Sequence, residues 1–172
     1  MMVDRQDRVW ISAPGLGVIV VDSTGASRWL NAESGDLATN FNHVILQDAE
    51  DAVWVGGVEG LTLTEGHVTH TRGADSPLLQ RSILGLVQDR EGQLWFGTTD
   101  GVYAASRDEM AQWMRQQRAD PPAVWSLGRR DGMSNEGLHE EHSPVGAIDG
   151  TGNVLFCVNE GLVRIEPKVA LS

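Results

Sequence analysis

The chain has little cysteine, few basic residues and no long apolar run. Its single cysteine, Cys157, cannot form an internal disulfide, so cysteine usage does not identify a redox compartment. Lysine and arginine number 13 against 24 acidic residues, and the net charge of −11 repels phosphate backbones and anionic membrane surfaces. No window approaches the ~18 apolar residues of a membrane span, and the start MMVDRQDRVW has no apolar signal-peptide core. We therefore expect no nucleic-acid partner and no membrane contact by this segment.

Aromatic residues are also scarce, with the exception of tryptophan. The chain has one tyrosine and three phenylalanines, but six tryptophans and 20 glycines. Many turns combined with a few large anchors are typical of an all-β repeat protein. With 41% hydrophobic residues, a chain of 172 residues can build one domain-sized core.

One sequence pattern occurs twice in nearly the same form. The segment QDREGQLWFGTTDGV at 88–102 matches QDAEDAVWVGGVEGL at 47–61. In each copy an acidic residue precedes a polar turn, an apolar-tryptophan pair and a small, Gly-containing run. The two tryptophans, Trp54 and Trp95, lie 41 positions apart. A period of this length is typical of propeller blades.

Two weaker copies complete the series. The copy at 4–18 keeps the order of the acidic residues and Trp10, whereas the copy at 149–162 has Leu155 where tryptophan stands in the others. The chain is therefore predicted to be one propeller fragment, residues 1–172. Its four units have the approximate bounds 1–40, 41–81, 82–128 and 129–172.

The third unit indicates what one repeat builds. Alternation and turn residues predict strands at 82–89, 94–99 and 102–106. The Asp100-Gly101 pair is a strong two-residue hairpin signal. The second unit adds a fourth strand, because 61–71 contains two short alternating runs joined by Glu65-Gly66. Each unit is thus predicted to be a four-stranded antiparallel blade of about 40 residues, and the fold class to be an all-β propeller.

The repeated tryptophan is expected to fill the space between adjacent blades, since one indole can bury on the order of 200 Å². This prediction concerns Trp10, Trp54 and Trp95. Gly56 and Gly97, each two residues further on, are expected where other groups approach the backbone closely. By the same alignment, Cys157 is expected to be a small buried residue.

A single amphipathic helix is predicted to interrupt the third unit. Ser106 and Glu109 form a capping box, and Pro121-Pro122 ends the segment, so the helix is expected at 107–118. Its apolar stripe is expected to pack on the propeller and consists of Met110, Trp113, Met114 and Gln117. The run at 123–128 is expected to resume the blade as its outer strand.

The segment QDREGQLWFGTTDGV resembles the two-component regulator propeller repeat, in which an apolar strand leads to Asp, a turn Gly and Leu-Trp-Phe-Gly-Thr. Such repeats form sensor regions of bacterial membrane-anchored histidine kinases, hybrid kinases and diguanylate cyclases. The run RRDGMSNEGLHEEHSP at 129–144 also looks like the segment before the last blade of such sensors. The resemblance implies a periplasmic location and the C-terminal part of a seven-bladed ring. The alternative that remains open is that the four blades close into a ring by themselves.

Three groups of residues are candidates for chemistry. The run LHEEH at 138–142 lacks the HExxH spacing that puts two histidines on one helical face, so no metal site is expected there. The acidic residues that begin the turns are expected to cap them through backbone N–H groups rather than to bind calcium: Asp48, Asp89 and Asp149. His67 and His70 fall on opposite faces of a strand. We therefore expect no catalysis, no metal and no cofactor.

The leading functional hypothesis is a non-catalytic ligand-sensing or interaction propeller, which the resemblance implies. Loops on a rigid scaffold carry function more often than the scaffold itself. The loop at 129–143 is therefore expected to form a ligand or partner surface through Asn135, Glu136, His139 and Glu140. The ligand is expected to be a small molecule or carbohydrate. The expected partners are the remaining blades of a parent propeller or another copy of this chain.

Two alternatives stay open. Streptogramin lyases are propellers with a similar Gly-x-Leu-Trp repeat and a His/Glu/Mg site. An enzyme of that kind would use His139, Glu140 and His142. A purely structural interaction module is the third hypothesis.

Overall fold

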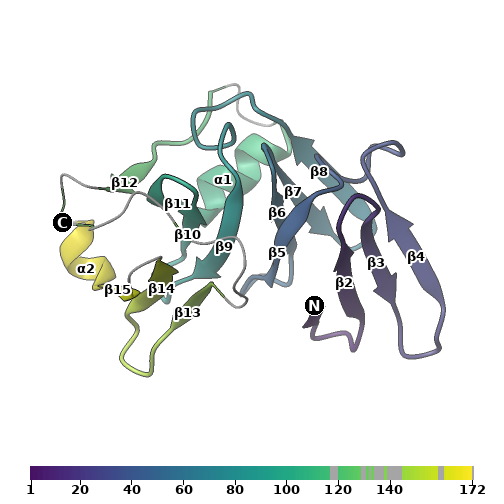
Figure 1. Cartoon of the computed structure of the whole chain (residues 1–172). Helices are drawn as coiled ribbons and strands as arrows, with labels where there is room; N and C mark the ends of the chain where they lie inside the picture. Colours follow the sequence, from purple (N-terminus) through teal and green to yellow (C-terminus); the bar gives the residue numbers. More distant parts are fainter. Residues whose placement is uncertain are drawn as a thin grey trace. The chain divides into compact units, whose positions relative to one another are not determined.

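The computed structural model describes residues 1–116, 120–128, 131, 133, 138, 145–158 and 161–171. Four antiparallel sheets follow one another along this part of the chain, and each is a meander of consecutive strands (Figure 1). The chain divides into two compact units, Met1–Ser82 and Ile83–Ser172, and each unit contains two of the sheets. The protein is an all-β protein built of propeller blades, as predicted.

The first unit holds blade 1 and blade 2. Blade 1 has the strand order β1-β2-β3-β4, with β1 (Met2–Val3), β2 (Val9–Ala13), β3 (Gly17–Val21) and β4 (Ser27–Leu30). Blade 2 has the order β5-β6-β7-β8, with β5 (Asn42–Gln47), β6 (Val53–Gly57), β7 (Gly60–Glu65) and β8 (Val68–Arg72). The two runs predicted at 61–71 are β7 and β8, joined by a turn in which Gly66 has a φ of 62°.

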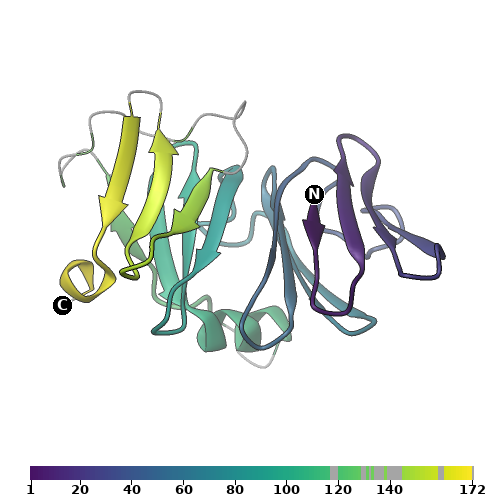
Figure 2. The ribbon, with the colours of Figure 1, turned by 90° about the horizontal axis from the view of Figure 1, so that it is seen from below.

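The second unit holds blade 3 and blade 4. Blade 3 consists of β9 (Ile83–Gln88), β10 (Gln93–Thr98), β11 (Gly101–Ser106) and β12 (Trp125–Leu127). Blade 4 has three strands in the described residues, β13 (Gly146–Ile148), β14 (Val154–Val158) and β15 (Gly161–Ile165). Its central strand β14 lies between the other two (Figure 2). The strands of blade 3 match the predicted ranges to within two residues.

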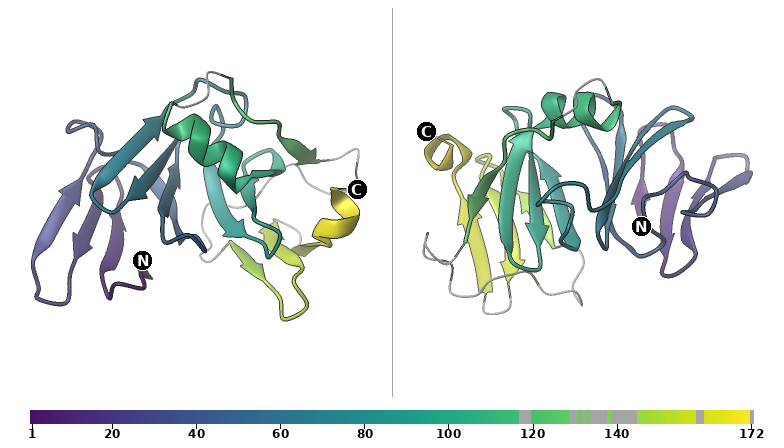
Figure 3. Two further views of the ribbon diagram at one scale, coloured as in Figure 1. Left: turned by 180° about the vertical axis from the view of Figure 1, so that it is seen from behind. Right: turned by 90° about the horizontal axis from the view of Figure 1, so that it is seen from above.

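The inserted helix α1 (Arg107–Met114) follows β11 directly, and the chain then returns along β11 as β12 (Figure 3). The Oγ of Ser106 accepts a hydrogen bond from the backbone N–H of Glu109 at 3.4 Å, which is the predicted N-cap. The helix ends four residues earlier than predicted, because Gln116 adopts a left-handed φ of 61°. The predicted apolar stripe is buried at Met110, Trp113 and Met114; Gln117 lies outside the described residues.

A second short helix, α2 (Pro167–Ala170), follows β15 and was not predicted. Its first residue is Pro167, whose fixed φ suits the start of a helix and whose missing N–H costs no hydrogen bond there. With only one turn, α2 has no apolar stripe by which sequence periodicity could have revealed it.

Each unit has a core shared by its two blades. In unit 1 the core joins Trp10, Val18 and Leu30 of blade 1 to Val53 and Val55 of blade 2. The unit 2 core joins residues of blade 3, including Trp95, Val102 and Ala104, to Val154, Phe156 and Ile165 of blade 4. Trp10 and Trp95 therefore lie between blades as predicted. Trp54 is also fully buried.

Phe156 of blade 4 packs against glycines of blade 3. A Cβ added at Gly97 would lie 2.9 Å from the ring of Phe156 and 2.2 Å from Leu138, so only glycine fits there without a shift. A Cβ added at Gly85 would come within 3.0 Å of the same ring. This confirms the close approach predicted at Gly97.

The prediction for Cys157 was wrong, because its side chain is exposed. Gly97, the residue aligned with it, is covered by Phe156 and Leu138. Cys157 stands on the opposite face of β14 from Phe156 and pairs with Leu162, which is 60% exposed. The aligned positions therefore differ in their neighbours, although their places in the strand are the same.

Candidate functional site

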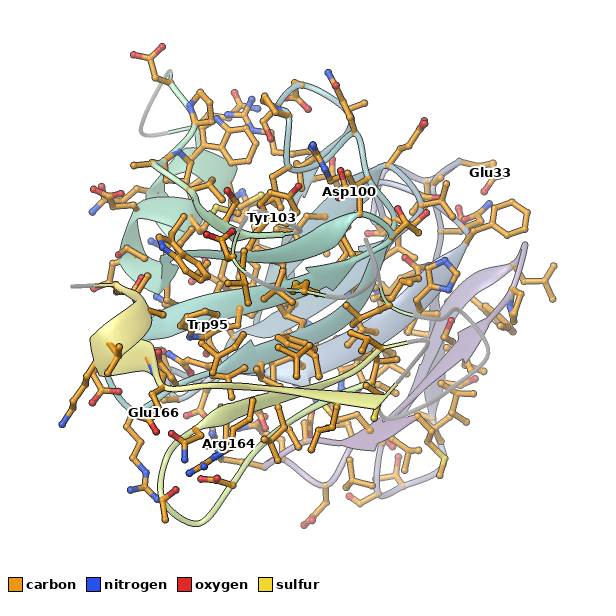
Figure 4. The ribbon with its side chains drawn as sticks, turned by 60° about the vertical axis from the view of Figure 1, so that its left-hand side comes forward. Glu33, Trp95, Asp100, Tyr103, Arg164 and Glu166 are labelled. Carbon is orange, nitrogen blue, oxygen red and sulfur yellow. The ribbon has the colours of Figure 1, made fainter. Side chains whose placement is uncertain are left out.

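Three of the four blades share one buried polar contact, which we call the Trp–Asp clasp. In each, the indole Nε1 donates to Oδ2 of an aspartate six residues earlier, at 2.7–2.8 Å: Trp10 to Asp4, Trp54 to Asp48 and Trp95 to Asp89. The other carboxylate oxygen, Oδ1, accepts two backbone N–H groups of the intervening turn; for Asp89 these belong to Glu91 and Gln93. Figure 4 shows Trp95 enclosed among the side chains of the sheet.

The clasp explains the acidic positions noted in the sequence. The predicted turn capping by Asp48, Asp89 and Asp149 is confirmed, since each carboxylate accepts backbone N–H groups. The backbone N–H groups and the indoles that donate to the carboxylates of Asp48 and Asp89 belong to the same blade as the aspartate. These carboxylates therefore serve the fold, because a buried charge is tolerated only when hydrogen bonds satisfy it.

Blade 4 replaces the clasp with a partly buried contact that has no tryptophan. Leu155 stands where the tryptophan is elsewhere, and Nδ2 of Asn153 donates to Oδ2 of Asp149 at 2.9 Å in its place. The hydroxyl of Thr151 also donates to Oδ1 of Asp149 at 2.7 Å. The hydrogen bonds from Thr151 and Asn153 hold the pKa of Asp149 well below its ordinary value, so this carboxylate remains charged.

The described residues contain no group of three or more His, Cys, Asp or Glu that could hold a metal ion. His70 lies 3.7 Å from the carboxylate of Glu65 in the same hairpin, and His67 lies in the turn before β8. These two histidines do not form a common ligand set.

The predicted site residues Asn135, Glu136, His139 and Glu140 lie outside the described residues, as does His142 of the lyase hypothesis. The described part of their loop includes Leu138, which is buried. Its backbone N–H donates to the carbonyl of Thr98 at 2.9 Å, and it forms a β-bridge with Val158. Leu138 thus anchors the segment to both blades of unit 2.

A hollow of about 590 Å³ lies near this anchor in unit 2. Its lining combines residues of the anchored segment, Asp131 and Met133, with β15 residues such as Val163 and Arg164. The hollow has a volume that small ligands occupy.

A smaller cavity of about 170 Å³ lies in unit 1, between blade 1 and blade 2. Its apolar wall includes Trp10, Val20 and Leu30. Six polar or charged residues also line it: Arg8, Asp22, Ser27, Arg28, Thr64 and His67. An apolar wall with a few convergent polar groups is the usual composition of a small-molecule site.

The two arginines of this cavity are each held by one carboxylate. Nε of Arg8 donates to Oδ2 of Asp4 at 2.6 Å, and its guanidinium lies 5.5 Å from the centre of the Trp10 ring. Nη2 of Arg28 donates to Oδ1 of Asp36 at 2.9 Å. Each guanidinium retains further N–H donors. The carboxylate of Asp22 also lines the cavity, so its polar groups carry both signs of charge.

Sequence reasoning missed this cavity. Arg8 follows Asp4 by four residues within the first turn, and Arg28 lies on the outer strand β4, where the repeats differ. The cavity forms only because two blades meet, so no local pattern in either blade indicates it. No signal in the sequence distinguishes these two arginines from the other ten.

Residues 77–100 match the family described as “Two component regulator propeller”. The matched segment contains β9 and most of the Trp95 copy of the repeat. The chain carries a two-component regulator propeller repeat. No curated protein matches the chain by sequence.

Several solved structures resemble the fold of the chain over nearly its full length. The extracellular domain of a putative hybrid two component system from B. thetaiotaomicron aligns with a TM-score of 0.76 and 18% identity, over 99% of this chain and 22% of that one. A second such domain from B. thetaiotaomicron aligns with a TM-score of 0.73 and 16% identity, over 98% of this chain and 23% of that one. Virginiamycin B lyase from Staphylococcus aureus aligns with a TM-score of 0.62 and 12% identity, over 98% of this chain and 55% of that one.

These identities establish a likeness of fold alone. The chain spans less than a quarter of the length of the two-component domains and about half the length of the lyase. Among the described residues, no helix is both long and apolar enough to cross a membrane.

Proposed function

We propose that this chain is part of a non-catalytic, extracytoplasmic sensor propeller of a bacterial two-component or cyclic-di-GMP signalling protein. The observation that carries the proposal is the match of residues 77–100 to the regulator propeller family. The fold shared with extracellular domains of two putative hybrid two component systems supports it. In this role the propeller binds a small molecule or carbohydrate and passes the change to an output domain.

The proposed ligand surface is the loop that carries Asn135, Glu136, His139 and Glu140. Two observations support this choice. Leu138, the described residue of this run, donates its backbone N–H to Thr98 of β10 and forms a β-bridge with Val158 of β14. The hollow of about 590 Å³ in unit 2, which Asp131 and Met133 line, offers room for a ligand of a few sugar units or less.

The proposal is tested on the natural protein that contains this segment, reconstituted in lipid vesicles with its kinase or cyclase output measured. A defined panel of mono- and oligosaccharides and amino acids serves as the probe. We expect at least one member to change the output, and replacement of 134–137 and 139–142 by Gly and Ser, with the buried Leu138 kept, to abolish that response. The matched control replaces 23–25, the exposed β3–β4 turn, by Gly and Ser. An unchanged response in the 134–142 variant would show that the loop is only a connector.

The lyase neighbours make catalysis the second candidate. The test is to incubate the purified chain with virginiamycin B and Mg²⁺ and to follow the substrate by chromatography. A non-catalytic propeller leaves the substrate intact. Consumption of the substrate that is lost in His142→Ala would instead establish the lyase and contradict the sensor proposal.

A further inference from the structure

The two blade pairs of the chain can be compared position by position, because their strands pair in the same register. The row of cross-strand partners that begins at Trp10 in blade 1 ends, two strands further on, at Arg28. The corresponding row in blade 3 begins at Trp95 and ends at Trp125. Trp125 packs against the core of unit 2, and its ring centre lies 5.5 Å from that of Trp95. Arg28 therefore stands where the other blade pair has a large aromatic side chain.

The facing blades differ in the same way. Thr64 of blade 2 pairs with Val53, and Ile165 of blade 4 pairs with Val154 at the same place in the repeat. Ile165 belongs to the apolar core of unit 2, whereas Thr64 brings a hydroxyl although it is only 4% exposed. Unit 2 thus has apolar side chains at both positions. Unit 1 has Arg28 and Thr64, and both line the cavity of about 170 Å³.

The hydroxyl of Thr64 is a buried polar group on the wall of this cavity. Its Oγ1 makes no hydrogen bond within the described residues. Thr64 shares a sheet face with its partner Val53, which belongs to the core between the two blades, so its side chain points toward blade 1. An unpaired buried hydroxyl is destabilising, and most buried polar groups in proteins have a partner. A molecule bound in the cavity can supply that partner.

Two guanidinium groups of the cavity keep donors for a carboxylate. Asp4 accepts from Nε of Arg8, and Asp36 accepts from Nη2 of Arg28, so each arginine retains further N–H groups. Arg8 is also held by the ring of Trp10, whose centre lies 5.5 Å from the guanidinium carbon. Hydrogen bonds between guanidinium and carboxylate are strong because both partners are charged.

The carboxylate of Asp22 lines the same cavity. Its Oδ1 accepts hydrogen bonds from the backbone N–H and the hydroxyl of Thr24, at 2.8 Å and 2.6 Å. These bonds hold the pKa of Asp22 below its ordinary value, so the group is an anion at neutral pH. A carboxylate has about four lone-pair sites and can accept further bonds, for which an ammonium group is a well-matched donor.

We propose that this cavity binds a small α-amino acid with a compact apolar side chain. Arg8 and Arg28 recognise its carboxylate, and Asp22 recognises its ammonium group. The hydroxyl of Thr64 adds a polar contact from the buried side of the cavity. The site belongs to unit 1 and does not involve the loop at 129–143, so it is separate from the ligand surface proposed above.

The size of the cavity and its apolar wall select the side chain of the amino acid. The wall includes Trp10 and Leu30, both fully buried, so it favours an aliphatic group. A cavity of about 150 Å³ in a protein core holds one benzene molecule. A volume of about 170 Å³ therefore admits alanine or valine and excludes tryptophan.

The test is a titration of the isotope-labelled chain with single compounds, followed by NMR. L-alanine and L-valine are the probes. Propionate and ethylamine are the analogues of alanine without the ammonium group and without the carboxylate, and L-tryptophan is the oversized control. The indole N–H signal of Trp10 reports on the cavity wall, and that of Trp95, at the corresponding place in unit 2, is the internal control. Concentrations from about 0.1 to about 30 mM cover weak affinities.

We expect alanine or valine to shift the Trp10 signal to saturation and to leave the Trp95 signal in place. Propionate and ethylamine should each bind at least about tenfold more weakly, because each lacks one charged partner. Tryptophan should not bind. If neither alanine nor valine shifts the Trp10 signal to saturation, the proposal is wrong. Propionate that binds as tightly as alanine would also overturn it, because the cavity would then recognise carboxylates in general.

Two charge variants test the assigned side chains. Arg28→Gln removes an exposed guanidinium and should weaken alanine binding by about tenfold or more. Asp22→Asn should bind alanine no better than propionate. Arg5→Gln is the matched control, since Arg5 is another exposed arginine of unit 1 that is paired with an aspartate but lies outside the cavity. Wild-type affinity in Arg28→Gln, or an equal loss in Arg5→Gln, would contradict the site.

Thr64→Val separates binding from folding. It should weaken alanine binding severalfold without lowering the thermal midpoint of the free chain, because the hydroxyl has no partner within the described residues. A lower midpoint, or an unchanged affinity, would overturn the role given to Thr64 in the site.

Discussion

Trp95 donates a hydrogen bond of 2.7 Å from its indole Nε1 to Oδ2 of Asp89, and both side chains are buried. The same indole lies in the core between blade 3 and blade 4. One side chain thus fills the space between two sheets and also satisfies the buried carboxylate that shapes the preceding turn. Loss of the indole should therefore have two separable costs.

We expect Trp95→Ala to lower the free energy of unfolding by about 3–5 kcal/mol, the usual cost of removing a large core side chain. Trp95→Phe keeps most of the apolar volume but leaves Oδ2 of Asp89 without its donor, which should cost about 1–3 kcal/mol. Urea unfolding followed by circular dichroism measures both. If Trp95→Phe were as stable as the wild type, the hydrogen bond would have no role in stability.

Stability should fall in acid in part through Asp4. Burial raises the pKa of Asp4, but hydrogen bonds from Trp10 and Arg8 outweigh burial and hold the pKa below its ordinary value of 3.8. A carboxyl with a lowered pKa in the folded state stabilises the fold above its unfolded pKa, and this contribution is lost as the pH falls through the folded value.

The measurement is the urea midpoint of wild type and Asp4→Asn between about pH 5 and about pH 2. Near pH 5 we expect a lower urea midpoint for Asp4→Asn than for the wild type. As the pH falls, the midpoint of Asp4→Asn should decline less steeply than that of the wild type. Asp7→Asn, at an exposed position in the same turn, is the control and should follow the wild type. Parallel curves for wild type and Asp4→Asn would contradict the role given to Asp4.

Gly97→Ala should destabilise unit 2. The new methyl group would lie 2.2 Å from Leu138 and 2.9 Å from the ring of Phe156, both in the core. Forcing a methyl into a packed core typically costs about 1–3 kcal/mol. Gly150→Ala is the matched control, since an added Cβ there meets nothing within 4 Å. Equal thermal midpoints for the two variants would refute the close approach.

Two buried threonines of β7 should respond in opposite ways to valine. Oγ1 of Thr64 has no hydrogen-bond partner within the described residues, so Thr64→Val removes an unsatisfied hydroxyl and should raise the free energy of unfolding by about 1 kcal/mol. Oγ1 of Thr62 accepts a hydrogen bond from the backbone N–H of Ala38 at 3.0 Å. Thr62→Val should therefore lower the free energy of unfolding by about 1–2 kcal/mol. Chemical denaturation of both variants measures the difference. Destabilisation by Thr64→Val would reveal a partner for its hydroxyl.

The features predicted correctly from sequence are those with local causes. The hairpins follow from turn residues such as Asp100-Gly101, and the start of α1 follows from the Ser106 cap. The spacing of six residues between aspartate and tryptophan was also present in three copies. It was interpreted as turn capping plus apolar filling, because a pattern of residue types does not show that Nε1 reaches Oδ2.

The features missed or mispredicted depend on contacts between blades. Cys157 aligns with Gly97, but which faces of a sheet are covered depends on neighbours that the strand itself does not encode. The cavity between Arg8 and Arg28 has the same origin. The expected ligand residues around Leu138 remain a prediction.

The Trp–Asp clasp also affects the order in which the protein folds. It joins residues only six positions apart, so the chain entropy lost in closing it is small compared with that of contacts between blades. Blades 1, 2 and 3 can each form their central hairpin from local interactions. Blade 4 has Leu155 at the tryptophan position and gains its buried contacts from blade 3, so it should form late and be the first part to open in hydrogen exchange.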